Sequence, residues 1–438
     1  MLESLLHRFR AHRAVVGVIG MGYVGLPLVL RFAEAGFKVI GFDSEEEKVR
    51  ALNTGKSYIR HCPSESIGRV LASGRFAATT TLERVPECDA LLICLPTPLS
   101  PQREPDLSYV VRMAEALVEH LRAGQLVVLE STTYPGATND VLRPVLARSG
   151  LVMGRELFLA FCPEREDPGS EAFTAYEIPR VVGGVDEASG DLAEALYQQI
   201  VSRTVRVRDA RTAEAVKLTE NIFRAVNIAL VNELKLIYSR LGIDIWEVIE
   251  AARTKPFGYM PFYPGPGIGG HCIPIDPFYL TWKAREVDLS TRFIELAGEI
   301  NRAMPGQIVQ VVQETLNERG RPLKDARIVI LGLAYKPDVD DLRESPALVI
   351  LEELLRRGAR VDYHDPFIAE IPPTRRHKAL TALRSLAWEE VLGGNHDLAV
   401  IATGHGKVDY AALCRALPLV IDTVNICRSI APDNVIYA

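Results

Sequence analysis

The sequence predicts an α/β protein in which two Rossmann-like, doubly wound domains are joined by a central helical domain with one long helix. Two alternations of apolar strand-like runs and helical segments, one in each half of the chain, predict the two sheets. A long amphipathic stretch between them predicts the helix. We expect the first domain over residues 1–204, the helical domain over 205–318 and the last domain over 319–438.

The composition of the 438-residue chain is that of an ordinary globular enzyme, with 48% hydrophobic and 24% charged residues. A formal net charge of -6 argues against a nucleic-acid partner or an anionic membrane surface. No uncharged apolar run reaches the roughly 18 residues that a membrane-spanning helix needs. The seven cysteines include no close-spaced pair, so we expect neither a metal site nor a disulfide framework. A reducing, cytoplasmic location fits this cysteine usage best.

The first sheet begins with a strand, a glycine turn, a helix and a second strand, in "VVGVIG", "MGYVGLPLVLRFAEAG" and "FKVIGFD". Gly20, Gly22 and Gly25 fit G-x-G-x-x-G, whose glycines allow a tight turn, close approach of a pyrophosphate and helix packing. Asp43 ends the second strand, where a carboxylate would hold a ribose 2′-hydroxyl and repel a 2′-phosphate. A merely tight turn would leave Asp43 unexplained, so the pattern predicts NAD rather than NADP, with Lys48 near the adenosine end.

Polar residues follow several of the later strands, and ligands bind at this carboxyl edge of a doubly wound sheet. These strands are expected in "ALLICLP", "QLVVLEST", "LFLAFCPE" and "RVVGGV". Thr97 and Thr132 offer hydroxyls to a nicotinamide or a sugar, although either could instead cap a helix or a turn. Glu164 and Arg165 begin a charged run that continues through residues 166–167, for which a plain surface cluster is the alternative.

The long helix is expected from "AEAVKLTENIFRAVNIALVNELKLIYSRLG", ending at Gly242. Lys217 and Asn221 are one turn apart on it and therefore share a face. Apolar neighbours place this face near the buried side, which makes the two side chains candidates to stabilise an oxyanion. On a solvated face the same pair would carry no function.

A glycine-rich segment, "GPGIGGHCIPIDPF" at residues 265–278, surrounds Cys272. Bare backbone permits positive φ and lets amide N–H groups meet a ligand oxygen. His271 and these amides would favour the reactive thiolate, whereas an isolated cysteine here would more simply be a core residue. Beside a nicotinamide site, the thiol could capture an aldehyde for a second oxidation. The other cysteines lie in apolar or unmarked segments, and we expect them to be packing residues.

The second alternation comprises "RIVILGLAY", "ARVDYHDP", "HDLAVIAT" and "LPLVIDT". Only Gly332 follows its first strand, so we expect no second dinucleotide site. Ser345 as N-cap and Gly358 after the end define a helix. Lys336 and Arg343 precede it and could meet a nucleotide diphosphate, with a solvated basic pair as the alternative.

Taken in order, six motifs resemble the UDP-glucose/GDP-mannose dehydrogenase family. They are the glycine fingerprint, "STTYPG", "CPER", "EAVKLTENIFRAVNIALVNE", "PGPGIGGHCIPID" and "GLAYKPDVDDLRESPA", and they cover nearly the whole chain. The resemblance implies an N-terminal NAD domain, a central domain through which a homodimer or larger oligomer forms, and a C-terminal domain for the nucleotide part of a UDP-sugar substrate.

The resemblance also implies roles for individual residues. Cys272 is the expected nucleophile, Lys217, Asn221 and Asp276 handle protons and the oxyanion, Glu164 assists thioester hydrolysis, and Thr132 lies in the same site. The expected cofactor contacts are Gly20, Gly22, Tyr23, Val24, Gly25, Asp43, Lys48, Thr97, Thr132 and Arg343. The expected substrate contacts are Glu164, Arg165, Lys217, Asn221, Tyr263, Gly265, Gly269, Tyr335 and Lys336.

The implied reaction is oxidation of a sugar C6 alcohol to a carboxylate with two NAD reduced, by way of a thiohemiacetal and a thioester on Cys272. Ile275 stands where glucose-specific members carry a lysine, and His271 with residues 163–165 resembles the branch acting on N-acetylated hexosamines. UDP-N-acetylglucosamine, for surface polysaccharide synthesis, is the best match. UDP-N-acetylmannosamine and UDP-glucose are alternatives.

Two rival functions and one departure from the family pattern remain. A hydroxyacid dehydrogenase of similar architecture would need Lys217 but no thiol, and a catalytically silent regulator would bind the same ligands without turnover. Relatives often carry an arginine after the aspartate of the last strand, where this chain has Val424, and Arg428 could replace it.

Overall fold

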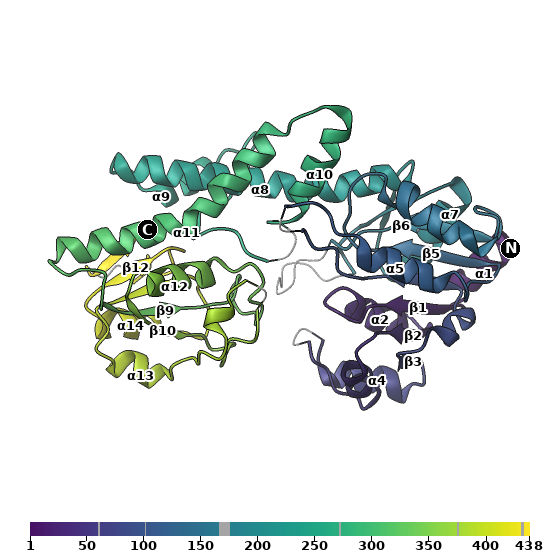
Figure 1. Cartoon of the computed structure of the whole chain (residues 1–438), viewed down its shortest axis with the longest axis horizontal. Helices are drawn as coiled ribbons and strands as arrows, with labels where there is room; N and C mark the ends of the chain where they lie inside the picture. The colour runs from purple at the N-terminus through teal and green to yellow at the C-terminus, as the bar shows by residue number, and fades with distance from the viewer. Residues whose placement is uncertain (60–61, 101, 166–175, 271–272, 375, 431–432) are drawn as a thin grey trace. The chain divides into compact units, whose positions relative to one another are not determined.

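The computed structural model describes the chain except residues 60–61, 101, 166–175, 271–272, 375 and 431–432 (Figure 1). The described residues form two compact units. The first comprises Met1–Glu220 and Phe278–Ser290, and the second comprises Asn221–Pro277 and Thr291–Ala438. Throughout this described part of the chain, every helix is too short or too polar to span a lipid bilayer.

The first unit is built on one sheet with the strand order β3-β2-β1-β4-β5-β6-β7-β8 among its described residues. All neighbouring strands are parallel except β6 and β7. The strands are β1 (Val15–Ile19), β2 (Lys38–Phe42), β3 (Phe76–Thr79), β4 (Ala90–Ile93), β5 (Gln125–Leu129), β6 (Leu157–Phe161), β7 (Arg180–Gly184) and β8 (Thr204–Arg206). Because β1 lies between β2 and β4, the order reverses there, which opens the ligand-binding edge of a doubly wound sheet.

The core of the first unit lies on both faces of this sheet. Leu92 in β4 packs in a cluster with Phe32, whereas the adjacent Leu91 packs on the other face with Val110. The helices that supply these clusters include α1 (Leu2–Arg10), α2 (Gly25–Glu34), α5 (Ser108–Leu117), α6 (Arg143–Leu146) and α7 (Glu187–Tyr197) (Figure 1). Burial on two faces explains why the central strands read as continuous apolar runs.

The second unit contains a parallel sheet with the strand order β10-β9-β11-β12-β13. Its strands are β9 (Arg327–Leu331), β10 (Arg360–His364), β11 (Leu398–Ile401), β12 (Val420–Asp422) and β13 (Val435–Tyr437). Helices α11 (Arg292–Glu318) and α12 (Pro346–Arg356) share one core cluster with the sheet, and α13 (Trp388–Gly393) and α14 (Tyr410–Ala416) share the other. Ser345 caps α12 by accepting the Ala347 N–H at 3.2 Å, as the sequence predicts.

The expected long helix is α8, Ala210–Arg240, and it begins in the first unit and continues in the second. Gly242 follows it with a φ of +70°, a conformation that favours glycine and ends the helix. Helix α9 (Ile245–Ala252) and helix α10 (Asp276–Ala284) complete the helical region. The predicted fold class is therefore confirmed.

Candidate active site

The glycine turn after β1 has the geometry that a dinucleotide requires. Gly20 has a φ of +89°, and a Cβ on Gly25 would lie 1.9 Å from the Gly20 carbonyl oxygen. A Cβ on Gly22, by contrast, would have no atom within 4 Å, so open space lies beside the backbone there. At the end of β2, Asp43 Oδ2 accepts the Met21 N–H at 3.0 Å, which holds the carboxylate beside this turn. These residues fit NAD.

The rim of the glycine turn carries the other N-terminal residues expected at the cofactor. Tyr23 is exposed and Val24 immediately precedes α2. Lys48 forms an exposed ion pair with Glu45 at 2.6 Å, and its ammonium lies 5.7 Å from the Tyr58 ring centroid. The Tyr58 hydroxyl donates to the Met21 carbonyl at 2.6 Å, so Lys48 lies near the turn through this ring.

The strand-end threonines lie together at the carboxyl ends of the adjacent strands β4 and β5. The Thr97 hydroxyl donates to the Thr132 carbonyl at 2.7 Å, and the Tyr279 hydroxyl donates to the Thr97 carbonyl. Thr133 is fully buried and its hydroxyl finds no hydrogen-bond partner among the described residues. Thr132 was predicted from its motif, whereas the neighbouring Thr133 was not.

Glu164, Arg165 and Lys217 are brought together in the first unit. The Lys217 ammonium donates to the Glu164 carbonyl at 2.5 Å, and Lys217 is buried, as its apolar neighbours predict. The Glu164 carboxylate accepts the Arg165 N–H at 2.6 Å. The Arg165 guanidinium itself pairs with Glu220 at 2.5 Å, one turn after Lys217 on α8.

A buried ionic cluster behind Glu164 was not foreseen. Arg180, at the start of β7, bonds Glu164 at 2.7 Å with one nitrogen and Glu130 at 2.8 Å with the other. The Tyr197 hydroxyl donates to Glu130. Burial raises the pKa of Glu130 to about 7 despite the nearby Arg180. The sequence offered one signal for this cluster: Glu130 ends the otherwise uncharged strand run in "QLVVLEST". A charge in such a buried position needs a buried partner.

A second buried carboxylate fixes the turn after Thr132. Glu214 on α8 accepts the Gly136 N–H at 2.5 Å, and its other oxygen accepts the Thr138 N–H at 2.9 Å and the Thr138 hydroxyl at 2.6 Å. Burial raises the pKa of Glu214 to about 7, although these hydrogen bonds lower it. Glu214 therefore ties the start of α8 to the loop that carries the predicted threonine.

Asn221 and Asp276 meet in the second unit. The Asn221 amide donates to Asp276 Oδ2 at 2.6 Å, and both side chains are buried. Asn221 comes from α8 and Asp276 is the first residue of α10. The resemblance names both residues as candidates, and this direct hydrogen bond between them was not predicted.

The glycine segment packs against the loop that follows β9. A Cβ on Gly269 would lie 2.5 Å from Tyr335 Cβ, and a Cβ on Gly270 would lie 2.9 Å from the Tyr335 ring. The Gly270 N–H donates to the Arg343 carbonyl at 2.9 Å. Glycine is thus required by contact with this loop. His271 and Cys272 lie outside the described residues.

The start of the glycine segment is held by two asparagines that were not predicted from the sequence. The Gly265 N–H donates to Asn232 Oδ1 at 3.0 Å, and the Asn232 amide donates to Asn301 Oδ1 at 3.0 Å. Tyr263, an expected substrate contact, stacks on Trp246 of α9 with ring centroids 5.6 Å apart. Buried amides on α8 and α11 therefore anchor the segment.

The basic residues expected at the nucleotide have different surroundings. Lys336 lies in the same loop as Tyr335. The Arg343 guanidinium forms an ion pair with Asp341 at 2.6 Å and stays partly exposed. Arg428, considered as a replacement for an arginine at Val424, pairs with Asp244.

The six cysteines that the structure describes are free thiols, and all but Cys94 are buried. Burial raises the pKa of Cys88 to about 12, which suppresses its thiolate. The expectation that these cysteines are packing residues is confirmed by their places in the core clusters.

Comparisons with known proteins agree with this arrangement. Three domains of the UDP-glucose/GDP-mannose dehydrogenase family match: the NAD binding domain over residues 14–201, the central domain over 211–303 and the UDP binding domain over 329–429. A UDP-N-acetyl-D-mannosamine dehydrogenase of Pyrococcus horikoshii is 35% identical, with 94% of this chain and 96% of that protein covered.

Two further relatives are similar over most of their length. A UDP-N-acetyl-D-glucosamine 6-dehydrogenase of Salmonella typhi is 32% identical over 89% of each chain. The solved structure of a UDP-D-ManNAc dehydrogenase from Pyrococcus horikoshii superposes with a TM-score of 0.86 at 34% identity, covering 97% of this chain and 98% of the other. The chain belongs to the UDP-glucose/GDP-mannose dehydrogenase family and is an NAD-dependent nucleotide-sugar dehydrogenase.

Proposed function

We propose that the protein oxidises the C6 hydroxyl of a UDP-N-acetylhexosamine to the carboxylate, with UDP-N-acetylglucosamine as the first candidate, for surface polysaccharide synthesis. The packing of Gly269 and Gly270 on Tyr335 carries this proposal. This packing joins the backbone of Gly270, two residues before Cys272, to the loop expected to hold the nucleotide. This packing supports a role for the cysteine segment in acting on a UDP-sugar bound by that loop.

The chemistry divides between two oxidations and one hydrolysis. NAD, held by the glycine turn and Asp43, supplies a hydride acceptor when bound. The first oxidation converts the alcohol to an aldehyde, and the Cys272 thiolate adds to its carbonyl carbon. Loss of a second hydride gives a thioester, and water then releases the acid and restores the thiol.

The remaining residues handle protons and charge. Lys217 and Asn221, one turn apart on α8, offer N–H donors to an oxygen that becomes negative during the addition, and Asp276 orients the Asn221 amide by accepting one of its N–H groups. Glu164, whose carboxylate pairs with Arg180, accepts a proton from the attacking water. A homodimer or larger oligomer, and three domains with boundaries after residues 204 and 318, belong to the same proposal.

The choice of sugar rests on two supports. Ile275 replaces the lysine of glucose-specific members, and the similar proteins include dehydrogenases named for N-acetylglucosamine and for N-acetylmannosamine. UDP-N-acetylmannosamine is the second candidate and UDP-glucose the third.

An NADH assay across UDP-N-acetylglucosamine, UDP-N-acetylmannosamine, UDP-glucose and UDP-galactose tests the proposal. We expect the highest kcat/KM with UDP-N-acetylglucosamine and two NADH formed for each acid released. Cys272→Ala should release no acid. Acid release by this variant at the wild-type rate would eliminate the thioester route, and one NADH per substrate would favour a hydroxyacid dehydrogenase instead.

A further inference from the structure

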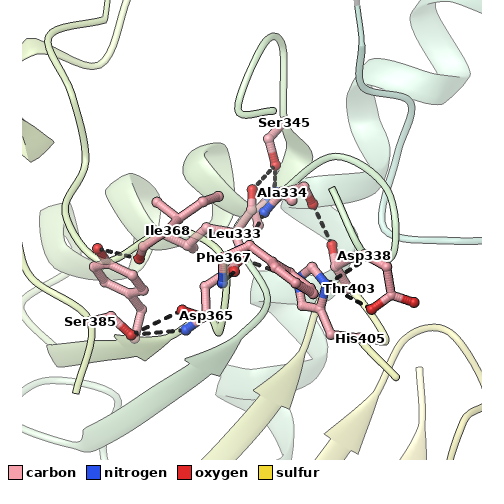
Figure 2. Close-up of polar contacts among 12 residues, drawn as sticks. Leu333, Ala334, Asp338, Ser345, Asp365, Phe367, Ile368, Ser385, Thr403 and His405 are labelled. Atoms are coloured by element: carbon pink, nitrogen blue, oxygen red, sulfur yellow. Dashed lines mark hydrogen bonds and ion pairs between the residues drawn. The ribbon is translucent and has the colours of Figure 1, made fainter. Parts of the chain in front are cut away.

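The loop between β9 and α12, residues 332–345, carries Tyr335 and Lys336 and is held at its base by side chains from the strands on either side of β9. Asp365 follows β10 and is fully buried; its Oδ2 accepts the Leu333 N–H at 2.7 Å and the Ala334 N–H at 3.1 Å (Figure 2). The Thr403 hydroxyl, after β11, donates to the Ala334 carbonyl at 2.6 Å. The first residues of the loop therefore have one fixed backbone path.

His405 extends this support to the far side of the loop. Its Nδ1 accepts the Asp338 N–H at 3.0 Å, and its Nε2 lies 3.1 Å from Asp365 Oδ2. Because Nδ1 is an acceptor, the ring proton is on Nε2, which donates to the carboxylate. Figure 2 shows the imidazole between the two aspartates, with Phe367 beside it. The ring is fully buried, so neither bond is exchanged for water.

The groups around this imidazole fix its orientation. Burial alone would raise the pKa of Asp365, but the His405 hydrogen bond and the loop N–H groups hold it below its ordinary value. The ionised Asp365 carboxylate orients the Nε2–H of His405. Asp338 Oδ1 accepts the Gly406 N–H at 3.0 Å. The Lys407 ammonium lies over the Phe367 ring, 5.2 Å from the ring centroid.

We propose that His405 is a positioning residue for nucleotide binding, which acts by fixing residues 332–338 through its Nδ1 bond to the Asp338 N–H. The inference rests on the proposed function, because it assigns the loop with Tyr335 and Lys336 to the UDP part of the substrate. The same loop supports Gly269 and Gly270, so loss of the Nδ1 bond loosens the surface on which the cysteine segment packs.

Two substitutions separate the two bonds of the imidazole. In His405→Asn, the amide oxygen stands where Nδ1 was and keeps an acceptor for the Asp338 N–H. In His405→Gln, the amide nitrogen stands where Nε2 was and keeps a donor to Asp365, while the Asp338 N–H is left buried without an acceptor. His396→Gln is the matched control, because His396 is a buried histidine paired with Asp362 at the opposite end of the same sheet.

The experiment measures UDP binding by calorimetry and steady-state kinetics with varied UDP-sugar and varied NAD. We expect His405→Gln to raise the Kd for UDP and the KM for the UDP-sugar about tenfold, with the KM for NAD unchanged. His405→Asn and His396→Gln should stay within about twofold of the wild type. Thr403→Val removes only the hydroxyl bond to Ala334 and should also weaken UDP binding, which keeps the test available if His405→Gln does not fold.

Equal losses in His405→Asn and His405→Gln, or wild-type UDP affinity in His405→Gln, would overturn the role of His405 while leaving the proposed function intact. An equal rise in the KM for NAD would overturn it too, since a general loss of structure would then explain the effect. Failure of the wild-type protein itself to bind UDP would refute the proposed function together with this inference.

Discussion

At the scale of single residues, the polar groups that matter most are buried and shared. Arg180 divides its guanidinium between Glu130 and Glu164, and Glu214 receives three hydrogen bonds from one turn. The sequence shows that Glu130, Glu164 and Arg180 follow or begin apolar runs, but it does not show which of them pair, because the pairing depends on which strands are neighbours. Asn221 and Asp276 were named as candidates because both belong to motifs of the family, but the bond between them was not predicted.

The Glu214 carboxylate makes stability depend on pH. Its pKa rises from an ordinary 4.5 to about 7 on folding, so its neutral form favours the folded state. Stability is therefore greatest below pH 4.5 with respect to this group and declines as the pH rises to about 7, by on the order of 3 kcal/mol. Urea unfolding at pH 5 and pH 8 should show a smaller difference in Glu214→Gln than in the wild type. The exposed Glu115→Gln serves as control, and an unchanged difference in Glu214→Gln would contradict the assignment.

The Glu164–Arg180 pair predicts a specific kinetic defect. Arg180→Lys keeps the charge but cannot bond two carboxylates with a planar fork, so Glu164 loses its fixed orientation. We expect acid release to slow by roughly tenfold or more, while the first NADH forms at nearly the wild-type rate. Rapid-quench mass spectrometry should then detect a sugar adduct on the protein. Slowing of both NADH steps to the same extent would show that Arg180 acts on folding rather than on hydrolysis.

At the scale of elements, the glycine segment and the loop after β9 form one packed structure. Gly269→Ala would place a methyl group 2.5 Å from Tyr335 Cβ and 3.1 Å from the Glu344 carbonyl, neither of which can move cheaply. Overpacking of this kind costs about 1–3 kcal/mol, so kcat/KM for the UDP-sugar should fall roughly tenfold to a hundredfold. A methyl group on the exposed Gly306 of α11 would meet no atom within 4 Å, and Gly306→Ala should be nearly neutral. Equal effects of the two alanines would contradict this packing.

Helix α8 carries an apolar stripe on its outer surface within the second unit. Phe223, Leu230 and Ile237 recur every seventh residue, and each is about half exposed. Seven residues are close to two helical turns, so the three side chains lie on one face. A regular exposed stripe of this kind suits a second copy of the chain.

If the protein forms the proposed oligomer through this stripe, the double change Leu230→Asp with Ile237→Asp should give a monomer. Light scattering coupled to size-exclusion chromatography measures the mass directly. Asn317→Asp, which adds a charge at an exposed polar position of α11, should leave the mass unchanged. A wild-type protein that is monomeric would refute both the interface and the proposed oligomer.

At the scale of the whole molecule, the sequence predicts the architecture well because each sheet begins with a strong local pattern. Glycine spacing and strand periodicity identify the first unit, and the capped helix after Ser345 identifies the second. The strands β3, β8 and β13 were not foreseen, because they lie at edges of the two sheets and are only partly buried, so they lack the continuous apolar run of a central strand. Strand order is also invisible in one sequence, and it alone brings His405 to Asp365 and Arg180 to Glu130. For this reason the motif residues could be named in advance, whereas the buried groups supporting them could not.

The imidazole between Asp338 and Asp365 has a practical consequence for spectroscopy. An imidazole ring with one protonated and one unprotonated nitrogen gives two well-separated nitrogen-15 resonances, whereas a ring that exchanges between tautomers gives averaged resonances. Isotope labelling of histidine would therefore turn His405 into a built-in sensor, and the order of the neighbouring loop could be followed during titration without attaching a dye.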